Sequence, residues 1–313
     1  MCDTCTIQTY TRAQTERYDP TRTLTLRTSF VNDFKRRFVK LTRIVKESIV
    51  GNDCFGLSNT LSVNVANAAG HNQFDHPTNA EKVAAFMLWF NSQVEAIIFE
   101  LEIMQQLGSM WQNKYIYEGY KRGVQRAALE MQKIGMRVDA PTIEQMMQRK
   151  LHIEALDALY NRVFTNLKEI TAAMEHAIRT VLAEGLANGD SAKMIADKLI
   201  AAINGKGLGD LGITDSLGRF IPAKRRAETL ARTEIVRAHH RATINEYKSY
   251  GDVGVYIMAE ILTAGDNQVC PACDALEGNF YTLDEAMYII PVHPNCRCIA
   301  LPYEVTKTEY DGK

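Results

Sequence analysis

VHPNCRC, residues 292–298, places one histidine and two cysteines within seven positions. A second tight pair, Cys270-Pro-Ala-Cys273, lies before that histidine, and nineteen residues separate the two groups. The chain has 313 residues but only seven cysteines and seven histidines. Five of these residues therefore gather in the segment 270–298, and this concentration points to a shared chemical role.

The spacing C-x2-C, nineteen residues, H-x2-C-x-C favours a structural zinc site. Zn²⁺ prefers four thiolate or imidazole ligands in a tetrahedron, and a CxxC turn presents two thiolates at a suitable separation. We expect Cys270 and Cys273 to bind the ion together with two or three residues of the second group, which are His293, Cys296 and Cys298. With four protein ligands, the ion would hold a small domain with a thin core together rather than catalyse a reaction.

Other interpretations of these residues stay open. The thiols are free in one alternative and form disulfides in another, although a chain without an export signal should meet a reducing cytosol. The signature of a catalytic zinc site of the deaminase type is not matched, because Val269 replaces the proline before the CxxC and His239-His240-Arg241 supplies no His-x-Glu. A further CxxC, Cys2 and Cys5, is interpreted as incidental, with metal capture or crosslinking as the alternative.

Composition indicates an ordinary globular protein. Hydrophobic residues make up 46% and charged residues 23%, and the length allows two domains with a sizeable core. The net charge of −1 provides no overall attraction to nucleic acid or to acidic membranes, so any nucleic-acid contact needs a local patch. No apolar run is long enough for a membrane span, and the N-terminus lacks the features of a secretory signal.

Apolar periodicity predicts several long helices. Residues 28–50, 79–108 and 142–186 each repeat apolar side chains at the spacing of one buried helical face. In 28–50 this stripe consists of Phe30, Phe34, Phe38, Leu41, Ile44 and Ile49. A further helix should end at Gly135, and another should cover 223–250. Such stripes are typical of a plain core, so they predict no cofactor.

The predicted fold is mainly α, and α+β overall. An irregular arm over 1–27 precedes a helical domain over 28–204, and a glycine-rich connector over 205–222 leads to a small mixed α+β domain over 223–305. A short tail follows, residues 306–313. The Cys/His cluster should close the small domain.

The helix predicted over 223–250 combines small and basic residues. Ala227, Ala231, Ala238 and Ala242 share one narrow face that would permit close packing against another element. The basic residues that could meet phosphates are Arg225, Arg226, Arg232, Arg237 and Arg241, together with His239 and His240. Acidic residues on the same helix oppose this, for example through a pair of Glu234 with Arg237, so a solvated, self-paired face is favoured.

Three segments resemble the C-terminal domain of the phage Mu F-like minor head proteins. They are RAETLARTEIVRAHHRATINEY (226–247), DNQVCPACDALEGNFY (266–281) and PVHPNCRC (291–298). The family signature falls on Arg232, Thr233, Glu234, Cys270, Cys273, Gly278, His293, Cys296, Arg297 and Cys298. One departure is the absence of the tryptophan that members often carry shortly before the aspartate at position 266. The resemblance is specific over about 185–300 and looser upstream.

The resemblance implies a non-enzymatic minor structural protein of the phage head, located in the virion near the portal and in the host cytoplasm during assembly. It would contact the portal protein, other capsid or scaffolding proteins and DNA without sequence preference, and take no small-molecule substrate. Two rival functions remain. One is a zinc-stapled nucleic-acid-binding module that uses Arg225, Arg226, Arg237 and Arg241. The other is an enzyme at the Cys/His cluster, for which Asp274, Glu277 and His293 are the nearby acid–base candidates.

Overall fold

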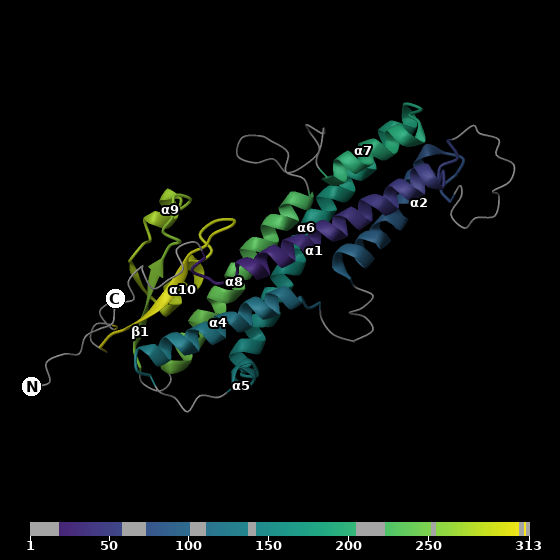
Figure 1. Ribbon diagram of the computed structural model, residues 1–313. Helices are drawn as coiled ribbons and strands as arrows, with labels where there is room; N and C mark the ends of the chain where they lie inside the picture. The colour runs from purple at the N-terminus through teal and green to yellow at the C-terminus, as the bar shows by residue number, and fades with distance from the viewer. Residues whose placement is uncertain are drawn as a thin grey trace, which may run out of the picture. The chain divides into compact units, whose positions relative to one another are not determined.

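The computed structural model describes residues 19–57, 73–100, 111–136, 142–204, 223–251, 255–306 and 310. Long helices dominate this part of the chain, and a three-stranded antiparallel sheet follows near its C-terminal end (Figure 1). The predicted fold class is thereby confirmed. The connector over 205–222, most of the N-terminal arm with Cys2 and Cys5, and most of the tail lie outside the described residues.

The elements follow one another in a simple order. They are α1 (Leu24–Lys46), η2 (Glu47–Gly51), α2 (Asn79–Val94), η3 (Glu95–Phe99), α4 (Lys114–Lys133), α5 (Ile143–Met147), α6 (Lys150–Ala187), α7 (Ala192–Asn204), α8 (Ala223–Gly251), β1 (Ile257–Leu262), α9 (Pro271–Asp274), β2 (Phe280–Thr282), α10 (Leu283–Ile289) and β3 (Ile299–Glu304). The segments η2 and η3 are π-helical continuations of the helices before them.

The first helix begins inside the segment that the sequence assigns to an irregular arm. Its first residue, Leu24, donates its backbone N–H to a carboxylate oxygen of Asp19 over 2.7 Å, and this bond satisfies a donor that a helix start leaves free. The predicted apolar stripe is buried except at one position. Ile44 is only half-buried, and Val45 is fully buried in its place. One helical turn takes about 3.6 residues, so the residue four positions after Leu41 lies closer to the buried face than the residue three positions after it.

Helix boundaries follow local capping and backbone geometry. Thr78 and Glu81 form a reciprocal capping box at the start of α2. The helical path continues to Phe99 and ends at Glu100, which has a left-handed φ of 55°, whereas the predicted residues 101–108 lie outside the described part. The helix predicted over 142–186 divides into α5 and α6, but the stripe from Leu156 to Val181 is buried as expected.

The chain packs into two compact units whose segments interleave along the sequence. One contains residues 112–163 and 229–313 together with the N-terminal 30 residues, and the other contains 31–111 and 164–228. The C-terminal sheet thus shares a unit with α4. The predicted boundaries of a helical domain over 28–204 and a small domain over 223–305 stay a prediction.

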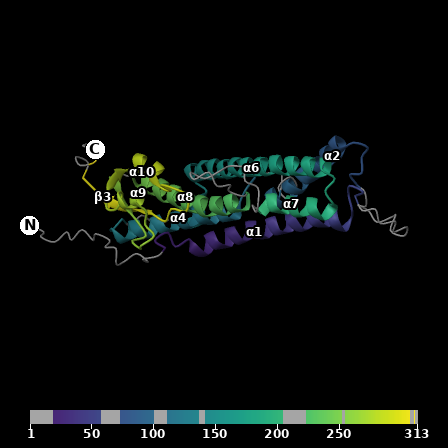
Figure 2. The ribbon, with the colours of Figure 1, turned by 90° about the horizontal axis from the view of Figure 1, so that it is seen from above.

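Small residues bring α4 and α8 into close contact. The two helices lie side by side in both views (Figures 1 and 2). Gly123 on α4 is so close to α8 that an added Cβ atom would lie 2.2 Å from the carbonyl oxygen of His239 and 2.6 Å from the Cβ atom of Ala242. Ala238 and Ala242 on α8 are fully buried, as are Ala227 and Ala231. The close packing predicted from the alanine face is therefore present.

The C-terminal sheet has the strand order β2-β1-β3, with both neighbours antiparallel to β1. A capping box of Thr282 and Glu285 starts α10 directly after β2. One core cluster joins this sheet and α10 to α8 and to Ala127 and Met131 of α4, and it includes the buried Cys273, Cys296 and Cys298. The cysteines are thus fixed at the margin of a hydrophobic core that two long helices help to build.

Candidate metal centre

The first arm of the site is the turn of α9. Cys270 occupies the position before this short helix, Pro271 is its first residue, and the Cys270 sulfur accepts the backbone N–H of Cys273 over 3.4 Å. Proline fits the first helical position because its missing N–H would be unpaired there. The CxxC sequence therefore folds so that both sulfurs lie on the same side of one turn, with Cys273 buried and Cys270 partly exposed.

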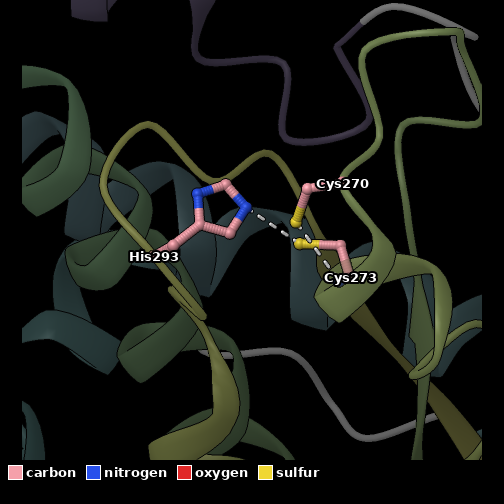
Figure 3. A group of neighbouring side chains, drawn as sticks. All are labelled: Cys270, Cys273 and His293. Carbon is pink, nitrogen blue, oxygen red and sulfur yellow. Dashed lines mark hydrogen bonds between the residues drawn. The ribbon is translucent and has the colours of Figure 1, made fainter. Parts of the chain in front are cut away.

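The second arm is the loop before β3, which carries His293. In Figure 3 the imidazole points at the two cysteines of α9. The Nε2 atom of His293 lies 3.1 Å from the Cys273 sulfur, and its Nδ1 atom lies 2.8 Å from the Pro294 carbonyl oxygen, to which Nδ1–H donates. A backbone carbonyl that receives the second ring N–H is a common feature of metal-binding histidines, because it fixes the ring and its tautomer.

All five predicted residues converge, in two groups that share one sulfur. The donor atoms of Cys270, Cys273 and His293 lie within 4.8 Å of one another, and so do those of Cys273, Cys296 and Cys298. Each of the four cysteines has a free thiol, so the disulfide alternative finds no support here. Cys54, the remaining described cysteine, is buried in the other unit.

Burial and hydrogen bonds within the cluster shift the pKa values of its thiols in different directions. The side chain of Cys298 is the main factor that lowers the pKa of Cys296 to about 5. Burial, followed by the charge of Cys296, raises the pKa of Cys273 to about 12, and the bond to Cys296 and burial raise that of Cys298 as well. For Cys270, the hydrogen bond from the backbone N–H of Cys273 lowers the pKa. The acidity of each thiol in the cluster thus depends on its neighbours, and a bound cation would favour the thiolate forms.

The donor set fits zinc. Thiolates and an imidazole are the ligands that Zn²⁺ prefers, and their donor atoms converge here in two groups of three that share the Cys273 sulfur. A hollow of about 30 Å³ is lined by Cys270, Cys273, His293 and Cys298 of the cluster, together with Thr263, Gln268 and Asn295 among other residues. A hollow of this size has space for a water molecule or a single ion.

Asn295 and Asp266 also belong to the site, although the spacing of the cysteines and the histidine does not predict a role for them. Asn295 has a left-handed φ of 63° and is held by Arg232 and Thr233 of α8, while Asp266 forms a two-bond ion pair with Arg297. The dipeptide Pro294-Asn295 is a turn signal that sequence analysis could have used. The partners of both residues lie far away in the chain, and only the folded structure brings them together.

The remaining signature residues also have structural roles. Gly278 has a φ of 72° and donates its N–H to the Ile261 carbonyl over 2.8 Å, in the turn before β2. Glu234 is buried and forms ion pairs with Arg237 over 3.1 Å and with Arg162 over 3.3 Å. The predicted Glu234–Arg237 pair is therefore present.

The histidines of α8 are not available for phosphate contacts. His239 and His240 are 3% and 2% exposed, because α4, the sheet and α10 cover α8 on several sides, and this corrects their assignment to a basic face. The Nε2–H of His240 donates to the Ala286 carbonyl over 2.7 Å. Among the arginines, Arg241 lies over the ring of Tyr288 at 5.1 Å, and Arg225 is exposed. The arginine part of the basic-face hypothesis stays a prediction.

Acid is expected to weaken this unit through the two buried histidines. Burial lowers the pKa of His240 from 6.5 to about 4 and that of His239 well below 6.5. At a pH between the lowered pKa of the folded chain and the pKa of 6.5 in the unfolded chain, the unfolded chain binds protons that the folded chain does not. The free energy of unfolding therefore falls as the pH falls below 6.5. Above pH 6.5 these two histidines do not change it. The substitution His240→Gln keeps an N–H donor for Ala286 and should reduce that slope by up to about 1.4 kcal/mol per pH unit. Urea unfolding of both proteins across this range measures the effect, and parallel curves would contradict it.

Comparison with known proteins supports the assignment of the C-terminal region. Residues 176–301 match the model of a family described as phage Mu protein F like protein. The matched region contains α7, α8, β1, β2, the first half of β3 and the whole Cys/His cluster, and it confirms the predicted resemblance. No curated protein and no solved structure matches the chain. Within the described residues, no helix has the length and apolar character needed to cross a bilayer.

Proposed function

We propose, from the premise that residues 176–301 form a phage Mu protein F like region, that this protein is a minor head protein of a tailed phage or prophage. It acts as a structural component of the virion and assists head assembly, DNA packaging or DNA delivery, without catalysing a reaction. The observation that carries the proposal is the family match over a region that contains both the signature helix α8 and the cluster.

The proposed cofactor is one structural zinc ion. Cys270 and Cys273 would hold it from α9, together with two or three of His293, Cys296 and Cys298 from the loop before β3. Bound zinc would supply a cross-link between these two segments rather than a reactive centre. The residues themselves support this role, because three of the four thiols are buried and the imidazole ring is already oriented by Pro294.

The enzyme alternative has little support in the geometry of the site. Glu277 accepts the backbone N–H of Thr263 over 2.6 Å, so this candidate base has a structural partner. For the nucleic-acid alternative, Arg237 is paired with Glu234 and both α8 histidines are buried, which leaves a smaller basic surface than the sequence suggests.

The proposed partner is the portal protein, and the proposed location is the interior of the capsid close to it. The full-length chain should co-purify with the portal protein encoded beside it and should be present in purified virions. Mass spectrometry of virions and pull-down from co-expressing cells provide the two measurements. Absence from virions, together with no complex when both proteins are soluble and in excess, would refute the proposal.

A further inference from the structure

In the loop before β3, residues that can bind a metal alternate with residues that are held by other parts of the protein. His293, Cys296 and Cys298 belong to the Cys/His cluster. Between them, Asn295 forms hydrogen bonds with α8, and Arg297 forms an ion pair with the segment before α9. The positions of the ligands are therefore tied to contacts that involve no metal-binding atom.

Helix α8 holds Asn295 at two points. Arg232 Nε donates to the Asn295 side-chain oxygen over 2.7 Å, and the Asn295 backbone N–H donates to the Thr233 hydroxyl over 3.0 Å. The same hydroxyl donates its proton to the Thr229 carbonyl over 2.8 Å, which leaves a lone pair free to accept from Asn295. Because Asn295 has the uncommon left-handed φ of 63°, these bonds also hold the turn that separates His293 from Cys296.

Asp266 connects the two arms of the site. Its carboxylate accepts two bonds from Arg297, over 2.6 and 2.7 Å, and one from the backbone N–H of Gln268 over 3.0 Å. Gln268 lies two residues before Cys270, and Arg297 lies between Cys296 and Cys298. One carboxylate therefore fixes the distance between the chain that leads into α9 and the chain that carries the second group of ligands.

We propose that Arg232, Thr233 and Asp266 are positioning residues that place the metal ligands before any metal binds, so that they set the zinc affinity of the site. This inference rests on the zinc site proposed above and links the Arg-Thr-Glu segment of α8 to the metal loop through Asn295. A loop that is already ordered loses less conformational freedom when the ion binds. Outer-shell partners of this kind typically contribute a factor of about 10 to 100 in metal affinity.

Thr233 offers a clean pair of variants in the full-length protein. Thr233→Val keeps the shape of the side chain but removes the acceptor for Asn295, whereas Thr233→Ser keeps it. We expect zinc affinity, measured by competition with a chromophoric chelator, to fall about 10- to 100-fold for Thr233→Val and to change less than about twofold for Thr233→Ser. Thr180→Val is the matched control, because the exposed Thr180 hydroxyl makes the same type of bond to a helix carbonyl, that of His176, and none to the metal loop.

A second readout uses the metal-free protein. Hydrogen exchange of the Asn295 amide should be faster in Thr233→Val than in the parent chain, because its acceptor is lost. If the parent chain binds zinc and Thr233→Val binds it equally well, the positioning role is refuted while the zinc site stands. If the parent chain binds no zinc, the zinc site and this inference fail together. Should Thr233→Val unfold, Asp266→Asn tests the same role from the other arm, with the same loss of affinity expected.

Discussion

Replacement of Cys273 by serine is expected to remove bound zinc from the protein and to unfold the segment around the cluster. The sulfur of Cys273 is the one donor that belongs to both groups of the site, and it lies 3.1 Å from His293 Nε2. A serine hydroxyl is a poor zinc ligand in comparison with a thiolate. We expect zinc affinity to fall by more than about 100-fold, beyond the loss typical of an outer-shell substitution. Metal analysis after gel filtration and thermal melting with and without a chelator measure both effects.

Cys54→Ser is the control for this experiment. Cys54 is buried, like Cys273, but belongs to the other unit and is not a member of the cluster. Its replacement should cost about 1 kcal/mol of stability and leave the zinc content unchanged. Equal zinc content in Cys273→Ser and the parent chain would contradict the structural zinc site.

Serine variants of the other four cluster residues would then reveal the ligand set. Three of these four should lose zinc almost as completely as Cys273→Ser does, because a tetrahedral site needs four donors. The fourth identifies the residue that the ion does not require.

Gly123→Ala is expected to be the most damaging substitution in the helical core. The new methyl group would lie 2.2 Å from the His239 carbonyl oxygen, a backbone atom that cannot move without a shift of α8. Overpacking of this kind usually lowers the free energy of unfolding by about 1–3 kcal/mol. A clash with a backbone atom costs as much as the top of this range or more, so we expect Gly123→Ala to lose at least about 3 kcal/mol. Equilibrium unfolding in urea, followed by circular dichroism, measures the change.

Gly119→Ala, one helical turn earlier on α4, provides the matched comparison. A methyl group there would lie 3.4 Å from the nearest atoms, which belong to Ile235, and this is an ordinary contact distance. Since alanine favours the helix by about 1 kcal/mol over glycine, this variant should be as stable as the parent or slightly more stable. If Gly123→Ala is as stable as Gly119→Ala and the parent chain, α4 and α8 are not packed as closely at Gly123 as described.

The sequence predicted the elements that depend on near neighbours. The apolar stripe from Leu156 to Val181 is buried as predicted, because a repeat of 3.6 residues is a local property of the chain. The pair Glu234–Arg237 forms for the same reason, since residues three apart are neighbours on a helix. The convergence of Cys270 and Cys273 with the 293–298 segment was also predicted, because thiols and an imidazole at this spacing favour binding to one shared ion.

Other features could not be predicted, because they depend on which distant segment covers a surface. The arginines and histidines of α8 alternate in a way that suggests a solvated face, yet His239 and His240 are buried under α4, the sheet and α10. Asn295 and Asp266 are ordinary polar residues in the sequence and acquire their roles only when α8 and the segment before α9 meet the metal loop.

By itself the sequence determined most of the helices and the set of groups that can bind zinc, because apolar periodicity and the spacing of cysteines and histidines can be read along the chain. Only the tertiary structure decided that α4 shares a compact unit with the C-terminal sheet, that α8 is covered on several sides, and that Thr233 supports the metal loop. The physical reason is that burial and hydrogen bonding between distant segments are properties of the packed whole, which no local pattern contains.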